Sequence, residues 1–189
     1  VFGYAETKFS ESYVFYPKNL DECRDIINFC IKKNLSICCR GAGLSYADMI
    51  TNNHQVILDT KLMNKIIYWD ETSGIICTQP GTTLGQIIYI SLLHNWILSS
   101  CPGSMNITVG GAVSNNVHGK DCYKSGNFSK QILEFKILLS SGEVITANSE
   151  SHNAIFKSVI GGMGLIGIII EIKLQLKKRI SRSLSNPKK

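Results

Sequence analysis

The spacing of apolar residues along this chain switches several times between the helical and the strand period. Residues 19–34 show the clearest helical pattern. Its apolar stripe consists of Cys23, Ile26, Ile27, Cys30 and Ile31. Asn19 stands at the N-cap position, and Glu22 follows three residues later, as in a capping box. The pattern therefore predicts a helix over residues 19–34.

Short runs rich in β-branched and aromatic residues, bounded by turn residues, predict the strands. These runs cover residues 35–39, 55–58, 65–69, 74–78, 96–98, 132–139, 143–147 and 165–176. Thr83 and Gln86 form a second capping pattern, which predicts a helix after Thr83. Further helices are expected over residues 108–117 and 154–160. This mixed order indicates an α+β fold and not a regularly alternating βαβ sheet.

Length and composition favour a compact unit with a real core. The chain has 189 residues, of which 44% are hydrophobic and 18% are charged. We therefore expect one domain or two small lobes that share a core. No apolar run is long enough to cross a bilayer, and residues 1–10 lack the pattern of a signal peptide.

The net charge of +6 arises at the end of the chain. All 14 acidic residues lie at or before Glu171, whereas seven of the 20 basic residues lie from Lys173 onward. A nucleic-acid groove needs basic side chains spread over a folded face, so no nucleic-acid partner is expected. Residues 177–189 are interpreted as a solvated basic tail.

The cysteine and histidine patterns predict neither a metal site nor a hydrolytic triad. The seven cysteines are odd in number, contain no Cys-x-x-Cys pair and lie mostly in apolar elements. They are interpreted as reduced core thiols, which predicts a cytoplasmic location. His54, His94 and His152 lack partners for a Ser/His/Asp triad, so we expect them at the surface.

Glycine-rich segments carry the chemical signal, and the first comprises residues 40–48. It follows a predicted strand, and Gly41 and Gly43 would let backbone N–H groups converge on an anion such as pyrophosphate. Ser45 adds a hydroxyl donor. A nicotinamide-type Rossmann turn needs glycine where this chain has Tyr46, which argues against that alternative. A plain left-handed turn without a ligand stays open at this point.

The second segment, residues 102–120, is unusually poor in bulky side chains. Such backbone leaves room for a flat or charged group to lie against it. Its expected backbone donors are Gly103, Gly110 and Gly111, and its expected side-chain amides are Asn106, Asn115 and Asn116. His118 and Lys120 follow at its end, and a purely structural histidine is the alternative.

A third segment, residues 161–168, contains four glycines directly before a β-branched run. Glycines at this place allow close approach of another backbone or of a ligand. The alternative is a β-bulge at the entry of a core strand. Taken together, the three segments indicate a large, two-ended cofactor.

The order of these motifs resembles the FAD-binding domain of the vanillyl-alcohol oxidase/p-cresol methylhydroxylase (PCMH-type) flavoenzymes. Within that family it is similar to the FAD-linked oxidases of the decaprenylphosphoryl-β-D-ribose 2′-oxidase type. The resemblance is carried by residues 40–48, 102–103, 108–112, 117–120, 125–126, 141–143 and 161–168. It implies two α/β lobes, residues 1–62 and 63–176, with FAD extended between them. Residues 177–189 would then lead to a substrate domain.

The resemblance also implies the site residues and the reaction. The implied cofactor-binding residues are Arg40, Gly41, Ala42, Gly43, Leu44, Ser45, Tyr46, Gly103, Thr108, Val109, Gly110, Gly111, Asn115, Asn116, Val117, His118 and Ile168. His118, Lys120 and Tyr46 would be catalytic, near the flavin ring and the sugar pocket. The implied reaction is the oxidation of a CH–OH group of a sugar or polyprenyl-phosphate sugar.

Two positions depart from the oxidase pattern, which usually has Arg at the place of Leu44 and Gly at the place of Ala47. The missing Arg removes a positive charge near the phosphates. The first loop also lacks the His of members that attach flavin covalently, so we expect non-covalent FAD. The alternatives are a non-catalytic flavin or nucleotide module and an aldonolactone-type oxidase. The expected partner is a small-molecule substrate, bound with a further domain, and the oligomeric state stays open.

Overall fold

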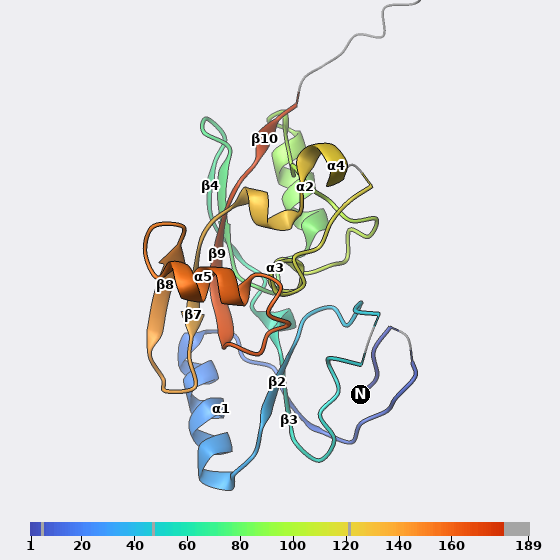
Figure 1. Cartoon of the computed structure of the whole chain (residues 1–189), viewed down its shortest axis with the longest axis vertical. Coiled ribbons are helices and arrows are strands. Elements are labelled where there is room, and N and C mark those ends of the chain that lie inside the picture. The colour runs from blue at the N-terminus through green and yellow to red at the C-terminus, as the bar shows by residue number, and fades with distance from the viewer. Residues whose placement is uncertain (5, 47, 121, 180–189) are drawn as a thin grey trace, which may run out of the picture.

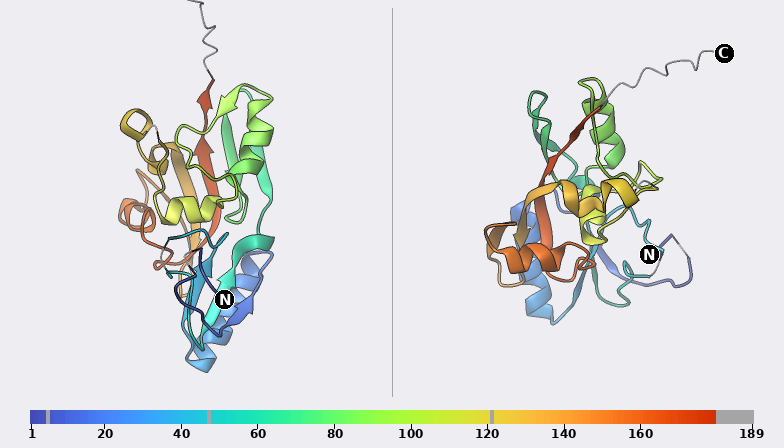
Figure 2. Two further views of the ribbon diagram at one scale, coloured as in Figure 1. Left: turned by 90° about the vertical axis from the view of Figure 1, so that its right-hand side faces the viewer. Right: turned by 45° about the horizontal axis from the view of Figure 1, so that its top comes forward.

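The structure, a computed structural model, describes residues 1–179 except residues 5, 47 and 121. It has two lobes, one built on a three-stranded sheet and the other on a five-stranded sheet (Figure 1). Two further views show the larger lobe above the smaller one (Figure 2). The expected α+β class is confirmed, whereas the exact lobe boundaries stay a prediction.

The smaller lobe contains a parallel sheet with β3 (Val56–Asp59) at its centre. β1 (Tyr13–Phe15) and β2 (Ile37–Arg40) flank it, and η1 (Thr60–Leu62) is a 3₁₀ turn directly after it. All four residues of β3 are buried, as a central parallel strand requires. β1 was not anticipated from the sequence.

The helix α1 (Leu20–Lys33) forms where the apolar stripe predicts it. Its N-cap Asn19 accepts a hydrogen bond from the N–H of Glu22 at 2.9 Å, and Asn34 ends it in the left-handed conformation. Four residues of the stripe are buried, but Ile31 is 64% exposed and does not join the core.

The larger lobe is an antiparallel sheet in the order β4-β5-β9-β7-β8. Its strands are β4 (Ile66–Asp70), β5 (Ile75–Thr78), β7 (Ile132–Leu138), β8 (Val144–Asn148) and β9 (Ile168–Gln175). The last of these, β9, lies at the centre between β5 and β7. It begins at Ile168, later than the sequence pattern indicated.

Helices and a small second sheet complete the larger lobe. They are α2 (Leu84–Leu92), β6 (Trp96–Ile97), α3 (Val109–Ser114), α4 (Cys122–Ser125), η2 (Phe128–Gln131), α5 (Asn153–Val159) and β10 (Lys177–Lys178). Thr83 and Gln86 form the expected capping box of α2. Thr108 caps α3, which is shorter than expected, and α4 and η2 were not anticipated.

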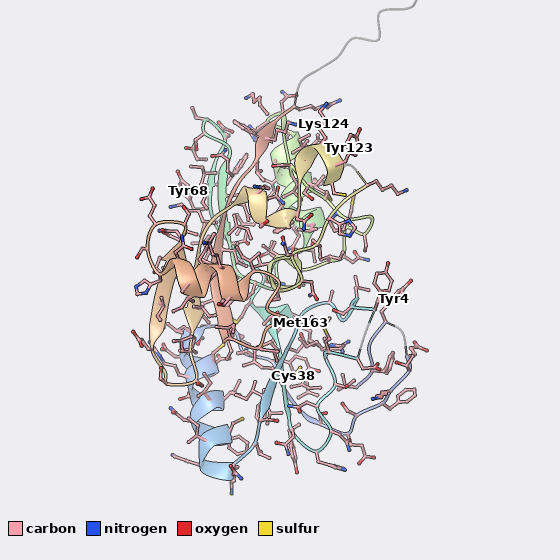
Figure 3. All side chains as sticks on the ribbon, viewed as in Figure 1. Tyr4, Cys38, Tyr68, Tyr123, Lys124 and Met163 are labelled. Atoms are coloured by element: carbon pink, nitrogen blue, oxygen red, sulfur yellow. The ribbon has the colours of Figure 1, made fainter. Side chains whose placement is uncertain are left out.

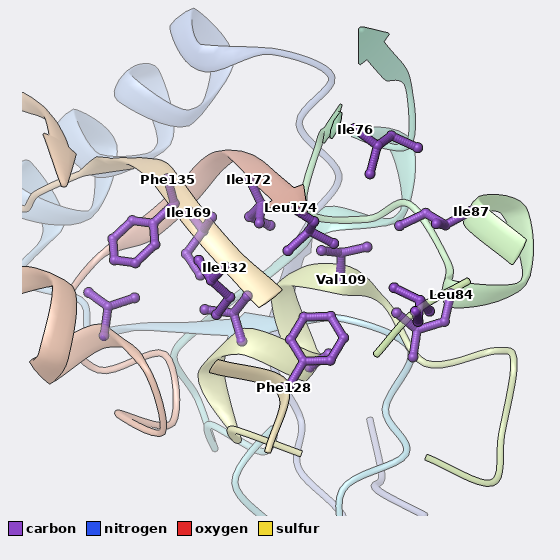
Figure 4. Packing of buried hydrophobic residues seen from close by; sticks show 14 of the residues in the cluster. Ile76, Leu84, Ile87, Val109, Phe128, Ile132, Phe135, Ile169, Ile172 and Leu174 are labelled. Carbon is purple, nitrogen blue, oxygen red and sulfur yellow. The ribbon is translucent and has the colours of Figure 1, made fainter. Parts of the chain in front are cut away.

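One hydrophobic core fills the larger lobe and a second joins it to the smaller lobe. The first packs Phe128, Phe135 and Val109 against the central strand β9 (Figure 4). The second packs the buried face of α1 against β3 and against Leu138 and Ile168 of the larger sheet. Because the two lobes share this core, their relative position is held by packing.

The expected basic tail begins within the folded part of the chain. Lys177 and Lys178 pair with β6 as β10, and the N–H of Arg179 donates to the carbonyl of Asn95 at 2.8 Å. The first residues of the tail are therefore part of the larger lobe. The expectation that the whole tail is a solvated segment is wrong for residues 177–179. Residues 180–189 lie outside the described residues.

Candidate functional site

A cleft of about 840 Å³ opens where the two lobes meet. Its walls come from the loop after β2, from α3 and the residues before it, and from the start of β9. Figure 3 shows Tyr4 and Met163, which both line the cleft, at the level between the lobes. The cleft thus collects all three glycine-rich segments on one concave surface.

The first glycine-rich loop lines this cleft and carries backbone donors that the described residues leave unused. Residues 41–46 all line it. Among the described residues, no acceptor takes a hydrogen bond from the backbone N–H groups of residues 42–46. Gly43 has φ of +74°, a left-handed conformation that glycine adopts without strain. Left-handed backbone next to unpaired N–H groups is the geometry of an anion nest.

Arg40 supplies a positive charge beneath this loop. A Cβ on Gly43 would come within 2.4 Å of the Arg40 Nη2, so the guanidinium lies directly against the loop. Arg40 Nη1 donates to the carbonyl of Phe2 at 3.0 Å, and its Nε lies 3.6 Å from Asp59 Oδ2. The oxidase pattern has an Arg at the place of Leu44, and this chain lacks that charge. Arg40 supplies a positive charge at the loop instead, and Asp59 partly balances it.

The first loop touches the second segment at one glycine. A Cβ on Gly41 would lie 2.2 Å from Thr108 Oγ1, so only glycine fits there. Thr108 Oγ1 itself accepts a hydrogen bond from the N–H of Gly111 at 3.3 Å, which caps α3. The two segments are thus held in contact by backbone and one hydroxyl.

The second segment offers fewer free donors than the sequence suggested. The N–H of Gly110 donates to the Pro80 carbonyl at 2.8 Å, and that of Gly111 is used by Thr108. These glycines allow close packing of α3, since a Cβ on Gly110 would meet Pro80 Cβ at 2.8 Å. Gly103 differs, because a Cβ there would meet nothing within 4 Å.

Four residues that the sequence assigned to the site do not line the cleft, namely Asn106, Val109, Asn116 and Lys120. The Val109 side chain is fully buried in the core, and its N–H donates to the Thr82 carbonyl. The Asn116 Oδ1 accepts from the N–H of Ser129 at 3.0 Å, which uses this amide within the protein. Lys120 is exposed outside the cleft. These residues therefore lie outside the lining of the cleft, and their assignment to the cofactor or to catalysis stays a prediction.

Two of the expected catalytic residues do reach the cleft. Tyr46 is 87% exposed and packs edge-on against Tyr4, with ring centroids 5.8 Å apart. His118 is exposed, and its Nδ1 lies 3.5 Å from the Gly119 carbonyl oxygen. Its Nε2 has no partner among the described residues and is available to a bound group.

The remaining predicted residues also line the cleft. They are Thr108, Asn115, Val117 and Ile168, beside Gly103, Gly110, Gly111 and His118. Asn115 Nδ2 donates back to the Gly111 carbonyl at 2.9 Å, which leaves its oxygen as the free end.

Several residues of the wall were not expected from the sequence. Tyr4, Met49, Ile50, Pro80 and Met163 all line the cleft. Met163 has φ of +55°, unusual for a side chain of this size, and its N–H donates to the Ser114 carbonyl at 2.8 Å. The four-glycine segment would have pointed to Met163, whereas nothing in the local pattern marks Tyr4.

Cys39, at the end of β2, also lines the cleft, but as a neutral thiol. Burial raises the pKa of its thiol to about 12, and the neighbouring Cys38 and Cys23 thiols add to this. A thiol with such a pKa is a poor nucleophile near neutral pH. Cys39 therefore contributes bulk to the wall and not reactivity.

A second, shallower hollow of about 440 Å³ lies on the open face of the larger sheet, beside Tyr68 (Figure 3). It is lined by paired charges, and Lys136 Nζ lies 2.8 Å from Glu171 Oε2. None of the glycine-rich segments borders it. We therefore place the candidate site in the cleft between the lobes.

The described part of the chain contains no cluster of His, Cys, Asp and Glu that could hold a metal ion. None of its helices combines the length and apolarity needed to cross a membrane. His54, His94 and His152 are exposed, as expected, and His94 pairs with Glu71.

Comparison with known proteins identifies the ligand class of the cleft. The pattern of the family described as FAD binding domain matches residues 12–148, well over half of the chain. The chain belongs to this family. The match includes the first loop, α3 and His118, so it covers most of the wall of the cleft. The resemblance inferred from the motifs is thereby confirmed.

Curated relatives of this FAD-binding domain are named as oxidases and dehydrogenases. The chain is 29% identical over 138 residues to decaprenylphosphoryl-beta-D-ribose oxidase of Mycolicibacterium smegmatis, covering 72% of this chain and 30% of the relative. It is 24% identical over 172 residues to mitochondrial D-2-hydroxyglutarate dehydrogenase of Danio rerio, covering 87% and 32%. The chain therefore spans about a third of the length of these relatives.

A solved structure shares the fold. Crystalline 6-hydroxy-D-nicotine oxidase from Arthrobacter nicotinovorans superposes with a TM-score of 0.85 at 18% identity, covering 94% of this chain and 39% of that chain. At this identity the likeness concerns the fold alone. It confirms two lobes of the PCMH type.

The cleft fits FAD by its own geometry. Unpaired N–H groups of residues 42–46 and the Arg40 guanidinium match a pyrophosphate. The open backbone at Gly103 and the apolar residues around Ile168 match the flat ring systems at the two ends of an elongated cofactor. A site of this shape, with few polar groups at fixed places, is typical of cofactor clefts.

Proposed function

We propose that this chain is the cofactor-holding part of a longer FAD-dependent oxidoreductase that oxidises a CH–OH group. The observation that carries the proposal is the cleft itself, in which glycine-rich backbone from both lobes meets. Bound FAD would accept a hydride from the substrate carbon. The chain's own residues bind, orient and shield the reacting groups.

The first loop would bind the pyrophosphate through the N–H groups of residues 42–46, with Ser45 and Arg40 adding a hydroxyl and a charge. Donors at fixed positions cost little reorganisation when an anion binds. His118 presents Nε2 to the cleft, where it would donate a hydrogen bond to a bound group or receive a proton. Tyr46 would offer its phenol at the open mouth of the cleft.

We further propose that FAD is held without a covalent bond. Residues 41–46 contain no histidine or cysteine, and the Cys39 thiol stays protonated because its pKa is raised to about 12. A reducing, cytoplasm-like compartment is supported by the free thiols of Cys23, Cys38 and Cys77.

The substrate would be a sugar or a polyprenyl-phosphate sugar, completed by a further domain of the whole protein. Support comes from the names of relatives, which include a decaprenylphosphoryl-ribose oxidase and a D-arabinono-1,4-lactone oxidase of Candida glabrata, 27% identical over 161 residues. Because the second relative is named as a lactone oxidase, an aldonolactone is the alternative substrate.

The visible spectrum of the purified chain tests this function. We expect yellow protein, or uptake of added FAD, and release of the flavin into the supernatant after acid precipitation. Flavin that stays in the pellet would contradict non-covalent binding. A colourless chain that takes up no FAD would contradict the function. Photoreduction of the bound flavin separates a redox domain from a binding module.

A further inference from the structure

Residues 1–10 lie outside the matched family pattern, which begins at residue 12, yet one of them reaches the cofactor cleft. Tyr4 is part of the wall of the cleft. Figures 1 and 3 show this N-terminal segment on the same side of the molecule as the loop after β2. We call residues 1–10, residue 5 aside, the N-terminal arm.

The arm contacts the first glycine-rich loop at its beginning. The Phe2 carbonyl accepts a hydrogen bond from Arg40 Nη1 at 3.0 Å. The same guanidinium lies against Gly43, where no side chain would fit. Phe2 and Asp59 therefore fix the cation on which the loop rests.

A second contact lies at the middle of the loop. The Tyr4 ring meets the Tyr46 ring edge-on, with centroids 5.8 Å apart. Both rings are largely exposed, at 62% and 87%. An exposed aromatic pair at the mouth of a cleft offers flat apolar surface to a flat ligand.

A third contact holds the end of the loop. Thr7 Oγ1 donates to Asp48 Oδ2 at 2.6 Å. The other carboxylate oxygen, Asp48 Oδ1, is buried without a partner among the described residues. Thr7 therefore gives this carboxylate the only side-chain or backbone hydrogen bond that the described residues provide to its oxygens, and losing it would leave both oxygens of a half-buried anion without a protein partner among those residues.

The arm is closed on itself, so these contacts act together. Phe2 and Phe9 form an antiparallel bridge, and their rings lie 5.8 Å apart. The N–H of Glu6 donates to the Gly3 carbonyl at 3.1 Å in the intervening turn. A closed turn fastened at three places along the loop restricts the loop more than three separate contacts would.

We propose that the N-terminal arm is the outer wall of the FAD cleft, with Tyr4 in contact with the cofactor and with Phe2 and Thr7 as positioning residues. The arm orders the first loop in the form that binds pyrophosphate. By linkage, bound FAD must then stabilise the arm in return. The inference rests on FAD binding in this cleft.

Substitutions in the whole chain, with FAD titrated by quenching of its fluorescence, test the role of Tyr4. We expect Tyr4→Ala to raise the Kd for FAD about 3- to 10-fold, whereas Tyr4→Phe keeps the ring and stays within about twofold. Tyr89→Ala is the matched control, because Tyr89 is 77% exposed on α2 outside the cleft. Equal Kd values for Tyr4→Ala and Tyr89→Ala would overturn the contact.

Thr7→Val tests the positioning role, with Thr146→Val on the exposed face of β8 as its control. We expect Thr7→Val to raise the Kd about fivefold or more. In the native chain, FAD should slow tryptic cleavage after Lys8 in the arm, but not after Lys33 at the end of α1. Thr7→Val should abolish this protection while the circular dichroism stays unchanged.

The outcomes separate the two proposals. A chain that binds no FAD overturns both the function and the arm's role. A chain that binds FAD with unprotected Lys8, and with variants as tight as the parent, overturns only the role of the arm. Protection of Lys8 is measured on the native chain. It therefore tests the role of the arm even if a substitution disturbs folding.

Discussion

The first loop and α3 contain two glycines each, but their backbone N–H groups are used in different ways. In the first loop, residues 42–46 line the cleft, and their N–H groups are unpaired among the described residues. In α3, Gly110 and Gly111 donate within the protein, and Gly110 packs against Pro80. The glycines of both segments pack against the protein, since Gly41 lies against Thr108 and Gly43 against Arg40, but only the loop keeps its N–H groups unpaired among the described residues and so available to a ligand.

This difference explains how one short helix can support a site without supplying its donors. A helix of six residues could bind an anion only through its first N–H groups, and those of α3 are already used. Its contribution is to bring Thr108 against Gly41, which fixes the loop that has free donors. Substitutions should therefore affect cofactor binding in the loop and stability in α3.

The largest expected effect concerns the strand that carries the loop. If this region binds ligands only through its backbone, the thiol of Cys39 should react slowly with alkylating reagents although Cys39 lines the cleft. Its pKa of about 12 lies above that of an ordinary thiol, so the thiol stays protonated below that pH and gains reactivity only as the pH rises toward it. At pH 8 we expect alkylation of Cys39 by iodoacetamide at least about 100-fold slower than that of a free thiol. Peptide mass spectrometry measures the rate, and fast labelling at pH 8 would show that β2 opens.

The next effect tests the contact between the two segments. Gly41→Ala puts a methyl group within reach of Thr108 Oγ1, and overpacking of this kind costs about 1–3 kcal/mol, or roughly 5- to 150-fold in the Kd for FAD. Thr108→Ala removes the obstructing hydroxyl, at a cost of about 1 kcal/mol in capping. The double variant should therefore bind FAD more tightly than Gly41→Ala alone. A double variant as weak as the single one would mean that the close approach is not the cause.

Gly110→Ala tests the opposite side of the comparison. Alanine normally stabilises a helix interior by roughly 0.5–1 kcal/mol relative to glycine. Here the methyl group would meet Pro80 Cβ at 2.8 Å, which cannot swing away, so we expect a net loss of about 1–3 kcal/mol in the free energy of unfolding. The Kd for FAD of the folded fraction should change little.

Gly111→Ala is the control in the same helix. The nearest atom to its added methyl group is Thr108 Oγ1 at 3.1 Å, a milder contact. Urea unfolding should rank Gly110→Ala as clearly less stable than Gly111→Ala. The reverse order would contradict the packing role of Gly110.

The sequence predicts features that depend on local pattern better than features that depend on contacts between distant segments. Sequence patterns located α1 and the runs that form β4, β5, β7, β8 and β9, and the glycine motifs located most of the cleft. Pattern alone could not tell which N–H groups of α3 find partners, because these partners, Pro80 and Thr82, lie in another segment. The same holds for Val109, whose place in the core is decided by the packing of α3 against the sheet.

The residues that were missed depend on contacts distant in sequence. Tyr4 belongs to the site only because the arm folds back onto residues 40–48, and no local signal marks that return. Asn116 looked like a ligand amide until the neighbouring turn brought Ser129 to it. β10 forms because β6 offers an edge to residues that read as a charged tail.

The smallest expected effect comes from Gly103, where a side chain would meet no protein atom within 4 Å. Gly103→Ala should therefore change the free energy of unfolding by less than about 0.5 kcal/mol. If FAD lies against the backbone there, the methyl group takes space from the cofactor and not from the protein, and the Kd should rise a few-fold. Gly142→Ala is not a suitable control because Gly142 has φ of +84°, so Gly111→Ala serves again for stability. An unchanged Kd for Gly103→Ala would remove this part of the second segment from the cofactor's path, leaving the first loop and the start of β9 as the walls that FAD touches.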